Sequence, residues 1–149
     1  MIRFNNNYNN NNYNNYSFSG VRKETGKMPD KETVLNKIVT TSNGMLASAA
    51  EKQVPENGKF KPITIEYKIP DTVNMAKITI ECDENEPKET RRLSVGVHHQ
   101  NADRLMSNYV FKGDKNQVIE YLNNADNAPD FVNTIKELSE KTDDFYNNL

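Results

Sequence analysis

The chain has 149 residues, of which 35% are hydrophobic and 27% charged, so it is more polar than an average globular protein. Nineteen basic against 21 acidic residues leave a net charge of −2, which argues against binding to nucleic acid or to an anionic membrane. A single cysteine, Cys82, excludes an internal disulfide, and no segment approaches the roughly 18 apolar residues of a membrane-spanning helix. We expect a cytoplasmic protein, with export by a non-classical route left open.

Residues 5–15 are all asparagine except for two tyrosines. Such a segment has too little apolar surface for burial to offset the entropy that ordering costs. We therefore expect a disordered low-complexity tail and linker over residues 1–27, followed by one domain over residues 28–149. Two interpretations of the tail remain open, a sticky segment used in assembly and a neutral repeat expansion.

A helix is predicted over residues 30–52, with Asp30 as its N-terminal cap. Its apolar positions recur every three or four residues, as expected for a helix with one buried side. These positions are Val34, Leu35, Ile38, Val39, Ser42, Met45, Leu46 and Ala49. The pair Asn43-Gly44 interrupts the pattern, and we expect the helix to kink or divide there.

Four segments then alternate apolar and polar residues with a period of two: 63–69, 76–82, 92–99 and 105–111. Such alternation is typical of strands with one buried face. The connecting segments are too short for crossover helices, so an antiparallel meander is predicted. Keeping the apolar faces together gives these predicted pairs: Tyr67 with Ile78, Ile80 with Val95, Val95 with Tyr109, Asp83 with Arg92, and Lys77 with His98.

Two helices are predicted after the strands. Asp114 and Gln117 form a capping-box pattern at the start of the first, and Pro129 suits the first turn of the second. The second helix carries an apolar stripe of Phe131, Ile135, Leu138, Thr142, Phe145 and Leu149. The predicted fold class is α+β: an N-terminal helix, a four-stranded antiparallel meander and two C-terminal helices. This plan is similar to that of cystatin-like folds, a likeness of architecture alone.

The two histidines are neighbours on one predicted strand and therefore point to opposite faces of the sheet. His99 falls at the end of the buried face, where we expect a packed or capping imidazole. His98 falls on the polar face near Lys77 and Met106. It is interpreted as an ordinary surface histidine, with proton transfer or pH sensing as the functional alternative.

Other groups offer little convergent chemistry. In the predicted register Cys82 lies about 20 Å from His99, so Cys82 is interpreted as a small core residue and not as a nucleophile. Glu66 and Glu81 could approach within about 5–8 Å, but an open sheet face provides no burial to raise one pKa. The acidic loop over residues 83–89 lacks the glycine of a calcium loop. We expect no cofactor and no bound metal.

Two functional hypotheses follow. The first is a non-enzymatic protein-interaction module that self-associates through the last helix or through the outer edge of the sheet. Its candidate contact residues are Met106 and Val110, expected as a small apolar patch on the outer face, and Phe131, Ile135, Leu138 and Phe145 on the helix.

The alternative hypothesis is a small acid–base enzyme or small-ligand binder. Its pocket would open between the helix and the sheet, and its polar candidates are Tyr67, Tyr109 and His99.

Overall fold

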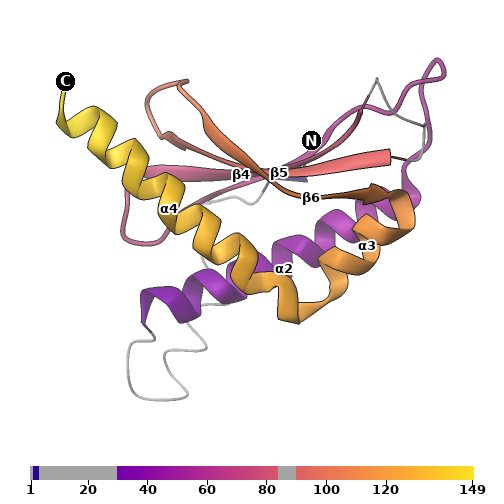
Figure 1. Ribbon diagram of the computed structural model, residues 1–149, viewed down its shortest axis with the longest axis horizontal. Helices are drawn as coiled ribbons and strands as arrows, with labels where there is room; N and C mark the ends of the chain where they lie inside the picture. Colours follow the sequence, from indigo (N-terminus) through magenta and orange to yellow (C-terminus); the bar gives the residue numbers. More distant parts are fainter. Residues whose placement is uncertain (1, 4–29, 84–89) are drawn as a thin grey trace.

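The computed structural model describes residues 2–3, 30–83 and 90–149. It confirms the α+β class, with one long helix, an antiparallel meander and two C-terminal helices. The helices lie on one side of the sheet (Figure 1). The elements are β1 (Ile2–Arg3), α2 (Lys31–Lys52), β3 (Ile63–Lys68), β4 (Asn74–Cys82), β5 (Thr90–His99), β6 (Met106–Asp114), α3 (Lys115–Asn123), a 3-10 turn (Ala125–Asn127) and α4 (Ala128–Asn147).

Helix α2 begins where the sequence predicts. The Thr33 amide donates to the Asp30 carboxylate at 2.7 Å, which confirms Asp30 as the cap. The helix is not divided at Asn43-Gly44, contrary to one expectation, because it runs unbroken to Lys52. Burial of residues such as Val39 and Leu46, both at 0% exposure, outweighs the penalty of about 1 kcal/mol for a glycine inside a helix.

The sheet contains a strand that no sequence pattern predicts. Its order is β1-β3-β4-β5-β6, and the two residues of β1 pair in parallel with Ile65 and Glu66 of β3. A two-residue strand is too short to show any periodicity, which is why the pattern misses it. Residues 4–29, which include most of the expected tail, lie outside the described residues.

The pairing within the meander is antiparallel, as predicted, but the registers of β3 with β4 and of β4 with β5 each differ from the prediction by two residues. Tyr67 lies opposite Ala76 and not Ile78, and Ile80 lies opposite Leu93 and not Val95. A shift of two keeps every side chain on its face, so alternation alone cannot detect it, and the turns between the strands decide it. For the same reason His98 lies opposite Met75 and not Lys77. Asp83 and Arg92 do form an ion pair, at 2.6 Å, although Arg92 lies opposite Glu81.

A β-bulge separates the two halves of the β5–β6 pairing. Before it Leu93 lies opposite Phe111, and after it Ser94 lies opposite Tyr109, so Val110 is the extra residue. The predicted pair of Val95 with Tyr109 is therefore wrong, since Val95 lies opposite Asn108. The bulge reverses which positions of β6 face the helices.

The C-terminal helices cover the sheet. Asp114 and Gln117 form the predicted capping box, with hydrogen bonds of 2.8 and 2.9 Å, and Pro129 lies in the first turn of α4. At the margin of the core, Tyr121 of α3 stacks on Phe111 of β6 at 4.3 Å between ring centroids. None of the helices in the described ranges combines the length and the apolarity required to cross a bilayer.

Candidate functional site

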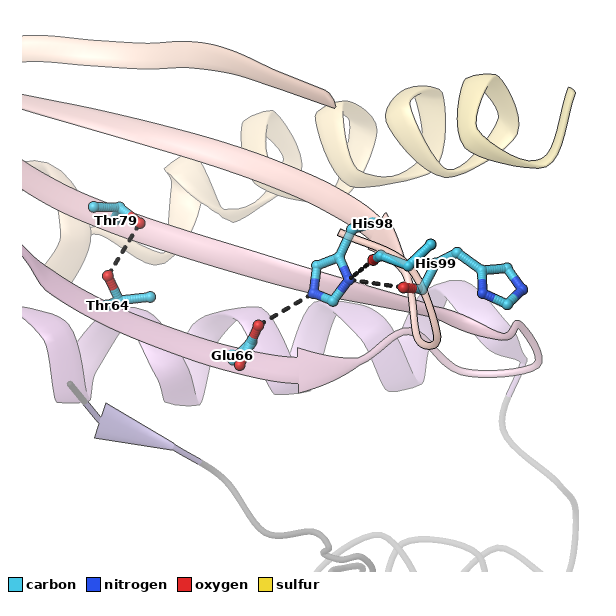
Figure 2. Close-up of polar contacts among 6 residues, drawn as sticks. Thr64, Glu66, Thr79, His98 and His99 are labelled. Atoms are coloured by element: carbon cyan, nitrogen blue, oxygen red, sulfur yellow. Dashed lines mark hydrogen bonds and ion pairs between the residues drawn. The ribbon is translucent and has the colours of Figure 1, made fainter. Parts of the chain in front are cut away.

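The sheet face opposite the helices is polar and is built from cross-strand rows. One row contains Glu66, Lys77, Gly96 and Ser107, and the next contains Thr64, Thr79, Ser94 and Tyr109. Figure 2 shows the hydroxyl pair of Thr64 and Thr79, whose oxygens are 3.2 Å apart. We call this surface the outer face, and it is the only face of the sheet on which described polar side chains gather in rows.

His98 is the most constrained ionisable group on the outer face. Its Nε2 lies 3.2 Å from a carboxylate oxygen of Glu66, and the two side chains are 20% and 16% exposed. Its Nδ1 lies 2.8 Å from the carbonyl oxygen of His99 and 3.2 Å from that of Ala102. In Figure 2 the His98 ring points across the sheet toward Glu66, whereas the His99 ring points away. The hydrogen bond to Glu66 is the main cause that raises the pKa of His98.

A shallow hollow of about 270 Å³ lies on the outer face between β4 and β6. Its floor includes Gly96, and Leu105 packs directly on that glycine, because a Cβ added there would lie 2.7 Å from Leu105 Cδ1. Tyr109 lines the hollow with its side chain 63% exposed, and its ring lies 5.0 Å from the guanidinium of Arg92. The remaining lining residues are Lys77, Thr79, Glu81, Ser94, Ser107 and Asn108.

The three polar candidates of the enzymatic hypothesis lie apart. Tyr67 lies on the helix-covered face at 4% exposure, where burial raises the pKa of its hydroxyl despite a hydrogen bond with Ser42. Tyr109 is on the opposite face, and His99 lies at the end of β5 against Tyr146 of α4, at 5.1 Å between centroids. The His99 ring also accepts a hydrogen bond from the Asn101 amide at 3.1 Å. The structure does not bring the three residues into one pocket.

The Cys82 thiol is also remote from the imidazoles. Cys82 lies opposite Arg91, eight positions from His99 along β5, which corresponds to about 26 Å. Glu66 and Glu81 are four positions apart in the observed register, about 13 Å, and they lie opposite Lys77 and Arg92. The predicted approach of the two carboxylates is therefore wrong, because it rested on the register that is shifted by two.

The candidate interaction residues are mostly inside the molecule. Phe131, Ile135 and Leu138 are 0%, 0% and 3% exposed, so the apolar stripe of α4 packs on its own sheet. Phe145 is half-buried and contacts Arg104, whose guanidinium lies 4.1 Å from its ring. The expected outer patch of Met106 and Val110 is wrong, because both pack against the core as a consequence of the bulge.

Asn74 and Arg91 are among the buried polar residues that the sequence interpretation missed. Asn74 is fully buried and donates to Ser139 Oγ and to the Asp143 carboxylate, both at 2.9 Å, which ties β4 to α4. Arg91 is 3% exposed and lies 4.4 Å above the ring of Phe60. Each lies an even number of residues from the buried apolar residues of its strand and therefore points to the same face. The alternation, extended to these positions, would have predicted their burial.

The outer edge of the sheet, one of the two surfaces expected for self-association, belongs to β6. Strand β6 is last in the sheet order, and within the described ranges no strand pairs with its outer edge. Ser107, Asn108 and Tyr109 are exposed along it. Its position after the other strands of a meander is the signal that predicts an edge.

Neither a search for metal-binding groups nor comparisons with known proteins assign a function to the site. Among the described residues no three side chains of His, Cys, Asp or Glu are grouped to hold a metal ion. Glu84, Glu86 and Glu89 of the acidic loop lie outside the described residues. Comparisons with protein-family models, curated proteins and solved structures found no match.

Proposed function

We propose that this chain is a non-enzymatic protein-interaction module that self-associates by pairing the edge of β6 with the β6 edge of a second copy. The observation that carries the proposal is the edge of β6, which no other described strand covers. Backbone donors and acceptors on such an edge readily pair with a strand of another chain. Exposure of Ser107, Asn108 and Tyr109 gives a second strand room to approach.

The composition of β6 favours a second copy as the occupant. Residues 106–111 carry no charge, and a two-fold axis places this segment opposite itself in the partner. Like charges directly opposite one another destabilise a strand pair, and here none would meet. The bulge limits the straight part of the edge to residues 106–109, so we expect a weak dimer.

The last helix no longer supports the proposal. Its apolar stripe is buried against its own sheet, so the edge of β6 is the surface on which self-association rests. We place the module in the cytoplasm, in keeping with its single cysteine, Cys82, and we propose a protein partner, with no role in binding nucleic acid.

The test is sedimentation velocity on the full chain from about 1 to 200 µM. The average mass is expected to rise from 17.1 kDa toward twice that value as the concentration increases. Tyr109→Lys places like charges near the two-fold axis, so we expect it to weaken the dimer about tenfold or more. Asn108→Lys is a second edge variant that tests the same contact without removing the tyrosine.

Val54→Lys is the matched control, because Val54 is 72% exposed and lies far along the chain from β6. It should associate like the unmodified chain. A chain that stays monomeric over the whole range overturns the proposal. Association that is equal in Tyr109→Lys, Asn108→Lys and Val54→Lys also overturns it, because another part of the chain then forms the contact.

A further inference from the structure

The surroundings of His98 require a charged imidazole. Both ring nitrogens face oxygen atoms that only accept hydrogen bonds: a Glu66 carboxylate oxygen at Nε2, and the carbonyl oxygens of His99 and Ala102 at Nδ1. A neutral imidazole carries one N–H and can satisfy one side alone, whereas the imidazolium carries two. The contacts are therefore complete only when His98 is protonated.

The charges around His98 come from the neighbouring strands and from the turn that follows β5. Glu66 favours the protonated form, whereas the cations on the adjacent rows oppose it. The charged residues near His98 whose side chains the structure describes are Glu66 and Lys68 on β3, Lys77 on β4, and Asp103 and Arg104 in the turn. Arg104 is directed to Phe145 of α4. Glu66 alone among them contacts the ring directly in a described hydrogen bond.

The Nδ1 contact holds the turn between β5 and β6, residues 100–105. Ala102 accepts from His98 through its carbonyl oxygen and donates its amide to the His99 carbonyl at 3.1 Å. Three residues later Leu105 packs on Gly96 and lines the hollow of the outer face. His98 thus connects β3, across β4, to the turn that carries Leu105.

Loss of the proton affects the two nitrogens unequally. A hydrogen bond to a carboxylate is stronger than one to a carbonyl, so a neutral His98 keeps its N–H on Nε2, toward Glu66. The lone pair of Nδ1 then faces two carbonyl oxygens, and the attraction that holds the turn is replaced by repulsion.

We infer that His98 is a proton-controlled anchor: its imidazolium holds the 100–105 turn, and deprotonation releases the turn and lifts Leu105 from the hollow. This inference does not depend on self-association of the chain. Because the pKa of His98 is raised above 6.5, the stabilisation is complete below pH 6.5 and is lost as the pH rises through the higher value of the folded state.

The test combines two NMR measurements on the full chain. A pH titration gives the pKa of His98, which should exceed 6.5. The second measurement is the hydrogen exchange of the Ala102 amide, corrected for its intrinsic rate. Its protection should be lower at about pH 8.5 than at about pH 5.5, by about tenfold for each unit by which the pKa of His98 is raised.

Glu66→Gln keeps an oxygen acceptor and removes the charge, so it should lower the pKa of His98. Glu81→Gln, on the same face opposite Arg92, is the matched control and should leave that pKa unchanged. His98→Gln should make the protection of Ala102 independent of pH. A His98 pKa at or below 6.5, or protection of Ala102 that is the same at both pH values in the unmodified chain, overturns the inference.

Discussion

Two neighbouring rows of one sheet differ in what holds them together. Ile65, Ile78 and Val95 lie side by side under the helices, and each is fully buried. One residue along, Glu66, Lys77 and Gly96 form the corresponding row on the outer face. The first row is stabilised by removing apolar surface from water, which depends little on the exact partner. The second depends on charge and on hydrogen-bond geometry, which change with the register.

The comparison explains why we propose the edge of β6, and not α4, as the surface for self-association. The apolar stripe of α4 packs on the buried rows of its own sheet, because the apolar side chains of these rows must be shielded from water. The outer face and the edge of β6 are polar and need no covering element for stability. A surface that the fold does not bury for its own stability remains accessible for binding a partner or for regulation.

The largest expected effect is on the helix-covered face. Phe131→Ala should lower the free energy of unfolding by about 3–5 kcal/mol, because it leaves a cavity where the ring is 0% exposed. Chemical denaturation of the two proteins measures the difference. Leu149→Ala, at a position 85% exposed, is the control and should change stability by less than about 0.5 kcal/mol. Similar effects of the two substitutions would contradict the assignment of α4 as the cover of the sheet.

A smaller effect is expected where a polar contact lies beneath the helices. Asn74→Ala removes the hydrogen bonds to Ser139 and Asp143 and should cost about 1–3 kcal/mol in the same denaturation experiment. Asn133→Ala changes an exposed asparagine on α4 and serves as the matched control. If Asn74→Ala is neutral, the tie between β4 and α4 contributes nothing, and the helix-covered face depends on apolar burial alone.

The smallest effect is expected on the outer face. Gly96→Ala brings a methyl group against Leu105 Cδ1, the far end of a flexible and partly exposed side chain that can rotate away. The loss of stability should stay below about 1 kcal/mol. A loss as large as that of Phe131→Ala would show that Leu105 is fixed in place, and the outer face would then be as tightly packed as the other.

The sequence was sufficient for the features that depend on local chemistry. Asp30 and Asp114 mark helix starts because a carboxylate beside free amides is a local signal. The alternation of residues 76–82 predicts a strand and its buried side. It cannot predict that Tyr67 lies opposite Ala76, because a register shifted by two has the same faces.

The candidate site was less predictable because it depends on register and on turns. The bulge opposite Leu93 and Ser94 moves Met106 and Val110 toward the core, and no residue pattern in β6 predicts this bulge. The contact of His98 with Glu66 crosses β4 and joins residues 32 positions apart. The carbonyl of Ala102 reaches His98 only because of the conformation of the turn. These three features could be identified only from the three-dimensional structure.

The central claim is that the chain associates through the edge of β6 and not through α4. The most direct measurement follows the backbone amide shifts of the full chain in an NMR dilution series. Residues 106–109 should shift with concentration, while residues 131–138 of α4 should not. Concentration-dependent shifts confined to α4, or no shifts in either segment, would contradict the claim.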